Sequence, residues 1–229
     1  MNVTRFPEGV TDVVPGTFMG DSGPVFDFGR YIRFTDDFTQ FIPAHWDIIG
    51  NTGGTVVRLS EGEADGVLEL FVDSAGGTPL SAQNLAQPFR WDRPTWVETR
   101  VKKSIADEQA LIIGLTDDNA TVRSRIGVSF LKETGLTTLN LAVNNGAETL
   151  FPTTYNFVSG VYVRLGMYFD GLFTVTVFAD DEVVGVFNIQ AALPSPAVPL
   201  TPSLVHVGNA FLDVTMSVDY FNAYQRREL

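Results

Sequence analysis

Three short apolar runs between Val161 and Ile189 constrain the fold of this chain more than any other stretch. They are separated by Asp170-Gly171 and by the acidic turn at 180–182. An Asp-Gly pair between alternating hydrophobic runs is the strongest short-range signal for a β-hairpin. Apolar side chains share one face of each of the first two runs, as expected when one face meets a core. The stretch therefore predicts a meander of antiparallel strands inside a large sheet.

The Asp-Gly loop also predicts a register. A two-residue loop would place Phe169 opposite Leu172 and set apolar side chains beside threonines. A three-residue loop with Gly171 in the left-handed region pairs Phe169 with Phe173 and aligns both apolar faces. Because a slip of one residue moves every side chain to the other face, we predict the bulged loop. The opposite face is half aromatic, which indicates that it is not wholly solvated: Tyr162, Arg164, Tyr168, Thr174, Thr176 and Phe178.

The chain after residue 33 repeats this pattern of short strands. Its sequence excludes long helical periodicity and any constant repeat. About a dozen short strands with turns at such spacing predict an all-β, two-sheet antiparallel jelly-roll sandwich over 34–229. One helical turn is expected at 81–86 within a long loop over 73–93, and the four prolines of 191–202 predict a crossing loop. The other strands are predicted at 33–41, 55–59, 67–72, 96–103, 110–115, 125–132, 138–143, 204–207 and 214–224.

Residues 1–33 differ from the rest in composition. Prolines and glycines alternate there without a period of 2 or 3.6 residues, so regular sheet is not expected. The segment still carries more large apolar side chains than a disordered tail. It is therefore an extended arm that lies over its own domain or docks on another subunit, and both alternatives stay open. The side chains expected to contact a partner are Phe6, Val13, Val14, Phe18, Phe26 and Phe28.

Charge and composition exclude several classes of partner. A net charge of −12 and a pI near 4.4 argue against nucleic acid, because a phosphate backbone repels such a surface. The sequence has no window of roughly 20 apolar residues for a membrane span, and no secretory signal is visible. We therefore expect folding in a cytoplasm, without a membrane partner. With no cysteine, disulfides and thiolate chemistry are excluded.

The residue types that catalysis needs are scarce. Only two histidines are present, which excludes a metal triad of histidines, and His206 is expected at a core or rim position. His45 is expected in a turn packed by an aromatic ring. Ser22, in Gly-Asp-Ser-Gly, has too little chain before it for a chymotrypsin-like protease. A glycosidase pair at Glu61 and Glu63 is the remaining enzyme hypothesis, although glycine interrupts that stretch. We expect no catalytic residue, no metal site and no cofactor.

The order of features from Asp36-Asp37-Phe38 onward resembles the concanavalin A-like, laminin-G-like jelly roll. The resemblance covers roughly residues 34–229 and implies a two-sheet sandwich. The glucanase branch of this fold has a Glu-x-Asp-x-x-Glu strand motif that is missing here, so hydrolysis is not implied. The runs that carry the resemblance are WVETRV (96–101), LIIGLTD (111–117), VRLGM (163–167), TVTVFAD (174–180) and VDYF (218–221), followed by Arg226-Arg227.

An acidic, cysteine-free jelly roll with an apolar arm is similar to the head decoration (cement) proteins of tailed bacteriophages. This resemblance implies a non-enzymatic virion structural protein, assembled in the host cytoplasm and located on the capsid surface. It further implies a homo-oligomer whose arm grips the major capsid protein. The alternative is a carbohydrate-binding module of a phage tail fibre or cell-surface protein. Its glycan-stacking residues would be Trp46, Trp91 and Tyr168.

Overall fold

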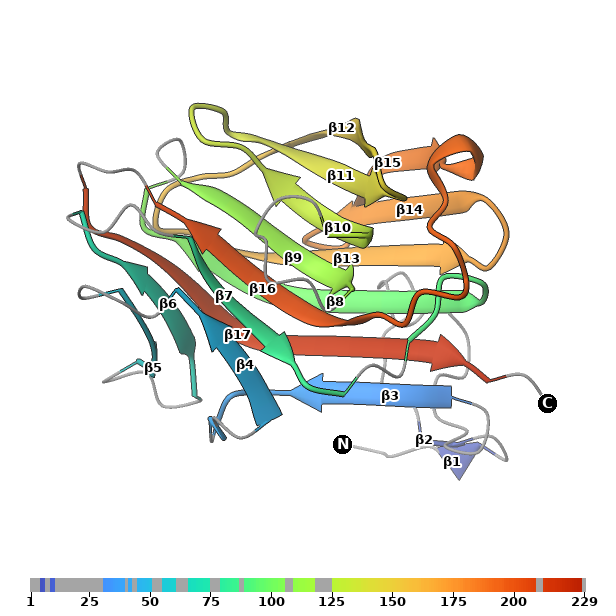
Figure 1. The fold of residues 1–229 in the computed structure, drawn as a ribbon, viewed down its shortest axis with the longest axis horizontal. Helices are drawn as coiled ribbons and strands as arrows, with labels where there is room; N and C mark the ends of the chain where they lie inside the picture. The colour runs from blue at the N-terminus through green and yellow to red at the C-terminus, as the bar shows by residue number, and fades with distance from the viewer. Residues whose placement is uncertain are drawn as a thin grey trace.

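Two antiparallel β-sheets lie against each other in this computed structural model (Figure 1). The all-β sandwich predicted from the sequence is confirmed. A turn of 3₁₀ helix, η2, spans Gln190–Ala192. No helix in the described part of the chain is long and apolar enough to cross a membrane. The structure describes residues 5–6, 9–10, 31–39, 41–42, 45–50, 55–60, 66–74, 79–86, 89–105, 109–117, 125–208 and 212–227.

One sheet has seven strands, and some of its neighbouring strands come from distant parts of the sequence. The inserted strand β16 separates β9 from β7, so the chain crosses between the sheets as it does in a jelly roll. In spatial order the strands are β12 (Glu148–Asn156), β11 (Thr138–Asn144), β10 (Gly127–Lys132), β9 (Ala110–Thr116), β16 (Thr201–Val207), β7 (Leu80–Asn84) and β4 (Trp46–Ile49).

The second sheet has eight strands and is organised around the long C-terminal strand β17. One edge of β17 pairs with β8, and its other edge pairs first with β6 and then with β3. The strands are β15 (Glu182–Asn188), β14 (Thr174–Ala179), β13 (Tyr162–Asp170), β8 (Pro94–Lys103), β17 (Val214–Arg226), β6 (Leu68–Val72) and β5 (Val56–Leu59), with β3 (Tyr31–Asp36) beside the end of β17.

The inward faces of both sheets form one apolar core. Trp91 is about 1% exposed and stacks on Phe169, with ring centroids 4.7 Å apart. Trp46 is also buried, and its indole N–H donates to the Asp36 carboxylate at 3.3 Å. Alternation of apolar and polar residues along each strand produces this arrangement, because every second side chain points inward.

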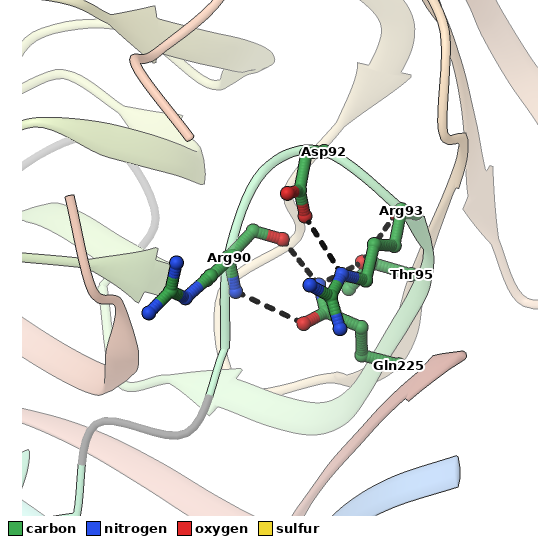
Figure 2. A network of polar contacts seen from close by, with 5 residues as sticks. All are labelled: Arg90, Asp92, Arg93, Thr95 and Gln225. Carbon is green, nitrogen blue, oxygen red and sulfur yellow. Dashed lines mark hydrogen bonds and ion pairs between the residues drawn. The ribbon is translucent and has the colours of Figure 1, made fainter. Parts of the chain in front are cut away.

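A buried glutamine fixes the loop that carries Trp91 (Figure 2). Gln225, near the end of β17, accepts a hydrogen bond from the Arg90 backbone N–H at 3.0 Å and donates to the Arg90 carbonyl. It also donates to the Thr95 hydroxyl at 2.8 Å, and that hydroxyl donates to the Arg93 carbonyl at 2.8 Å. Arg93 pairs with Asp92 at 3.0 Å. Because buried polar groups need partners, this network holds the loop at one position over the core.

The meander is confirmed, but the predicted register of its first loop is wrong by two residues. Phe169 lies opposite Val175 rather than Phe173. The two apolar faces are nevertheless aligned, because a shift of two residues keeps each side chain on its face. Gly171 has the predicted positive φ, at +84°. The outer face is half-buried, as predicted.

A single carboxylate explains the longer loop. Asp170 Oδ1 accepts hydrogen bonds from the backbone N–H groups of Leu172, Phe173 and Thr174 at 2.7–3.0 Å. Phe173 is thereby held in the loop, 40% exposed, and does not join the strand. Burial of the Asp170 carboxyl raises its pKa, but the backbone N–H groups outweigh that effect and leave the pKa below its ordinary value.

Several predicted elements need correction. The helical turn expected at 81–86 is wrong, since residues 81–84 belong to strand β7, which pairs with β16 and β4. Strand β12 was not predicted; it contains Pro152 and lies at the sheet edge, where the missing N–H is tolerated. The strand expected at 33–41 is β3, which begins at Tyr31 and therefore extends into the segment assigned to the arm.

Part of the arm also forms strand. Arg5–Phe6 (β1) pairs antiparallel with Gly9–Val10 (β2), although regular sheet was not expected there. The side chain of Phe6 and the other predicted partner contacts, Val13, Val14, Phe18, Phe26 and Phe28, lie outside the described residues.

Candidate functional site

The outer face of the seven-stranded sheet carries a row of very small side chains. Ser203 on β16 lies opposite Gly114 on β9, which lies opposite Ser129 on β10, which lies opposite Ala142 on β11. A Cβ atom added at Gly114 would lie 2.8 Å from Ser129 Cβ, so a larger residue does not fit there without movement. Because these four side chains are small, none of them projects far from the backbone in the middle of the face.

Buried hydrogen-bonding groups lie along one side of this row. Gln83 on β7 donates through Nε2 to Ser203 Oγ and to the Asp117 carbonyl, both at 2.9 Å, and to Thr116 Oγ1 at 3.2 Å. The Thr116 and Ser203 hydroxyls are 2.7 Å apart. Gln83 is about 1% exposed, and its Oε1 has no hydrogen-bond partner among the described residues. Leaving a buried acceptor without a partner costs free energy, and this atom lies beneath the surface of the face and lines neither of its hollows.

A guanidinium lies on the same side of the face. Arg125, which precedes β10, is buried and donates through Nη2 to the Ser81 hydroxyl of β7 at 3.1 Å. The side chain therefore extends across the sheet. It lines a small hollow of about 10 Å³ together with Thr116, Gly127, Ser129, Ala142, Asn144, Glu148 and Ile112.

The other side of the row is mostly apolar and holds a larger hollow. A cavity of about 300 Å³ lies there, at the lower end of the range for sites that bind small molecules. Ile112 lines both this cavity and the small hollow, so the two adjoin. The remaining lining residues are Pro79, Ala110, Leu131, Glu133, Thr134 and Val207.

The face is therefore graded from polar to apolar. Hydroxyl, amide, guanidinium and carboxylate groups gather at one end, and aliphatic side chains surround a cavity at the other. Such a surface suits a ligand with both hydroxyl groups and apolar C–H faces. The described residues contain no group of three or more His, Asp or Glu side chains that could hold a metal ion.

The predicted glycan-stacking residues do not meet at this face. Trp46 and Trp91 are core residues without an exposed ring face, so neither can stack on a sugar. Tyr168 lies on the outer face of the other sheet, stacked on Trp96 with centroids 4.9 Å apart. Glu61 and Glu63 lie outside the described residues.

Both histidines lack the setting of a catalytic base. His206 is fully buried, as expected, with Nδ1 2.7 Å from the Leu70 carbonyl. The pKa of its imidazole is lowered to about 3: burial is the main cause, the bond to Leu70 opposes it, and the nearby Lys103 charge adds a smaller lowering. His45 is exposed, next to Trp46.

Sequence reasoning missed Gln83 and Arg125, the two side chains that reach across this face. Gln83 was predicted to lie in a helical turn, and that prediction does not say toward which face of the sheet its side chain points. The usable signal was the recurrence of small or polar residues at alternate positions of otherwise apolar strands, as at Thr116, Ser129 and Ser203. Alternation of this kind indicates an outward face that is low and hydrogen-bonding.

Solved structures with this architecture support the assignment of the fold. The Emp47p carbohydrate recognition domain has a TM-score of 0.60 and 13% identity, over 87% of this chain and 99% of that chain. The fold is that of a lectin-like jelly roll. A protein of unknown function from Shewanella oneidensis MR-1 has a TM-score of 0.62 and 16% identity, over 86% of this chain and 87% of that chain.

A third structure is described with the endo-acting O-glycanases that human gut bacteria express to initiate mucin breakdown. Its TM-score is 0.63 at 14% identity, over 84% of this chain and 98% of that chain. No protein-family model and no curated protein match the sequence. At such low identities the likeness establishes the fold alone, and the function has to be argued from the residues of the site.

Proposed function

We propose that this protein is a non-enzymatic carbohydrate-binding domain that holds its ligand on the outer face of the seven-stranded sheet. The observation that carries the proposal is the apolar cavity of about 300 Å³, which shares Ile112 with a small hollow lined by polar groups such as Arg125 and Glu148. A pyranose ring offers apolar C–H faces and hydroxyl groups, which match the two ends of this face. The carbohydrate recognition domain among the structural neighbours supports the same class of ligand.

A glycan array followed by calorimetric titration of the best ligand tests the proposal. We expect Ala110→Trp, which fills the cavity, to weaken binding at least about tenfold, because the ligand loses its apolar contact. Glu148→Ala should weaken binding to a smaller extent, since this exposed carboxylate lines the polar end. Glu182→Ala, an exposed carboxylate on β15, is the matched control and should bind like the wild type. Unchanged affinity in Ala110→Trp would refute the location.

The non-enzymatic part of the proposal is tested with the same ligands. Each is incubated with the protein and assayed for released reducing ends, and we expect none. Release that is lost in Glu133→Gln or Glu148→Gln would identify a hydrolase at this face, because those carboxyls line its two hollows. Release lost in Glu61→Gln or Glu63→Gln would place the reaction in the loop between β5 and β6.

A second candidate function is the capsid decoration protein implied by the resemblance to phage cement proteins. The observation that favours it is the short β1–β2 pair, since an arm that forms strand pairs within itself suits addition to the sheet edge of another subunit. The partner would then be the major capsid protein, and the location the virion surface.

Deletion of residues 2–30 tests this second candidate. The truncated protein keeps β3 and the whole sandwich, so it should fold with an unchanged far-ultraviolet circular dichroism signal. We expect it to lose binding to capsids of the particle that encodes it, measured by co-sedimentation, because the arm supplies the contact area. Equal co-sedimentation of the full-length and truncated proteins would remove the arm from any such role.

A further inference from the structure

A stripe of aromatic and aliphatic side chains crosses the outer face of the eight-stranded sheet. Tyr224 on β17 lies opposite Trp96 on β8, which lies opposite Tyr168 on β13. Trp96 and Tyr168 stack with centroids 4.9 Å apart, and Tyr31 on β3 meets Trp96 edge-on at 5.9 Å. Phe178 on β14 packs against the same cluster.

The stripe continues to the sheet edge at β15. Val183 lies opposite Phe178, and Val186 lies opposite Thr176. A bulge in this strand turns Val184 toward the core and leaves both other valines on the outer face, where Val183 is 57% and Val186 is 61% exposed. We define the aromatic stripe as Tyr31, Tyr224, Trp96, Tyr168, Phe178, Val183 and Val186.

The dimensions and composition of the aromatic stripe are those of an interaction surface. It spans six neighbouring strands, from β3 to β15, and therefore about 24 Å at the usual strand spacing. Tyrosine, tryptophan and arginine are enriched at the centres of protein interfaces. Trp96 and Tyr224 are each about 5% exposed, the other three rings are half-buried, and Val183 and Val186 are exposed. Partly exposed apolar surface that continues over neighbouring strands is typical of interaction sites.

Charged side chains beside the stripe are largely paired with each other. Arg100 contacts Asp219 at 2.6 Å, and its guanidinium lies 4.4 Å from the Tyr162 ring. Arg164 pairs with Asp181. The charges described on this face and at the turn between β14 and β15 are balanced: Arg33, Arg58, Arg100, Lys102, Arg164 and Arg226, with Glu69, Glu98, Asp170, Asp180, Asp181 and Asp219.

This near-neutral face belongs to a chain whose net charge is −12. Two copies repel each other through the acidic remainder of their surfaces, so their association costs least where the face is neutral. An anionic polymer would require a clear excess of cations, which the face lacks. The charge balance therefore fits a second copy of this chain better than an acidic partner.

We propose that the aromatic stripe is the surface through which two copies of this chain associate, sheet face against sheet face. A two-fold axis through the stripe would bring the same side chains of both copies together. The face proposed to bind carbohydrate is on the other sheet and stays open in this dimer. Each dimer would thus present two outward binding faces, which raises avidity for a multivalent ligand.

Sedimentation velocity of the purified full-length chain, from about 1 to about 100 µM, tests the proposal. We expect a monomer–dimer equilibrium that tightens when sodium chloride is raised from about 0.05 to about 0.5 M, because salt screens the repulsion between acidic copies. A monomer at every concentration and both salt levels would overturn the proposal and leave the stripe to another partner. Association that weakens with salt would equally contradict it.

A pair of double variants locates the interface. Val183→Asp with Val186→Asp should weaken dimerisation at least about tenfold, because unpaired carboxylates would be buried at the contact. Val158→Asp with Val161→Asp adds the same charge at valines that are 57% and 51% exposed away from the stripe, and should dimerise like the wild type. Thermal melts establish that both variants are folded. Equal dimerisation by the two double variants would refute the stripe as the interface.

Discussion

Replacing Trp91 with alanine is expected to lower the free energy of unfolding by about 3–5 kcal/mol. The indole is almost fully buried and stacked on Phe169, and the Gln225 network prevents its loop from collapsing into the space left behind. Trp91→Phe should cost less than Trp91→Ala, because it leaves a smaller cavity and keeps an aromatic ring against Phe169. It also removes a buried indole N–H that has no partner among the described residues.

Urea denaturation followed by circular dichroism measures both effects. Leu172→Ala is the control, since this side chain is 65% exposed and its removal should change stability by less than about 0.5 kcal/mol. A loss below about 1 kcal/mol for Trp91→Ala would contradict the placement of this residue in the core. It would also reopen the hypothesis that Trp91 stacks on a glycan.

Acid is expected to destabilise the protein through His206. Its pKa is about 3 in the folded chain and near 6.5 when unfolded, so between these values the unfolded state binds a proton that the folded state does not. Stability is therefore lost as the pH falls from 6.5 toward 3, by up to about 1.4 kcal/mol per pH unit. Between pH 7 and pH 5 the contribution of this residue amounts to about 2 kcal/mol.

Urea titrations at pH 7 and pH 5 isolate this contribution. His206→Leu should be less stable than the wild type at pH 7, because the Leu70 carbonyl loses its partner, yet lose about 2 kcal/mol less on acidification. His45→Leu removes the other histidine, which is exposed, and should follow the wild-type pH dependence. Parallel pH dependence in the wild type and His206→Leu would contradict a neutral buried imidazole.

Local alternation predicted most of the strands but not the register between distant ones. The run at 96–103 alternates cleanly and is observed as β8, extended to Pro94. The β7 sequence, LSAQN, gives only a weak signal, because its inward residues are Leu80 and Ala82 and it has none of the β-branched or aromatic residues typical of strands. This segment becomes a strand because it pairs with β4 and β16, which are distant in the sequence, and local propensity does not reveal such pairing.

The candidate site was beyond sequence reasoning for the same reason. Gln83, Thr116 and Ser203 meet because three separate strands align in one register, and each residue alone is unremarkable. Trp46 and Trp91 were predicted to stack on sugars, but both are among the largest side chains of the core. Burial of an aromatic ring in the core of a sandwich is strongly favourable, because each ring removes a large apolar area from water.

The proposed function depends on carbohydrate binding at the outer face of the seven-stranded sheet. A crystal structure with the best glycan from the array tests it most directly. We expect a sugar ring against Ile112 and Leu131 in the cavity, with its polar substituents toward Glu133 and Thr134. A glycan bound on the eight-stranded sheet or in the loops, with this cavity empty, would contradict the account.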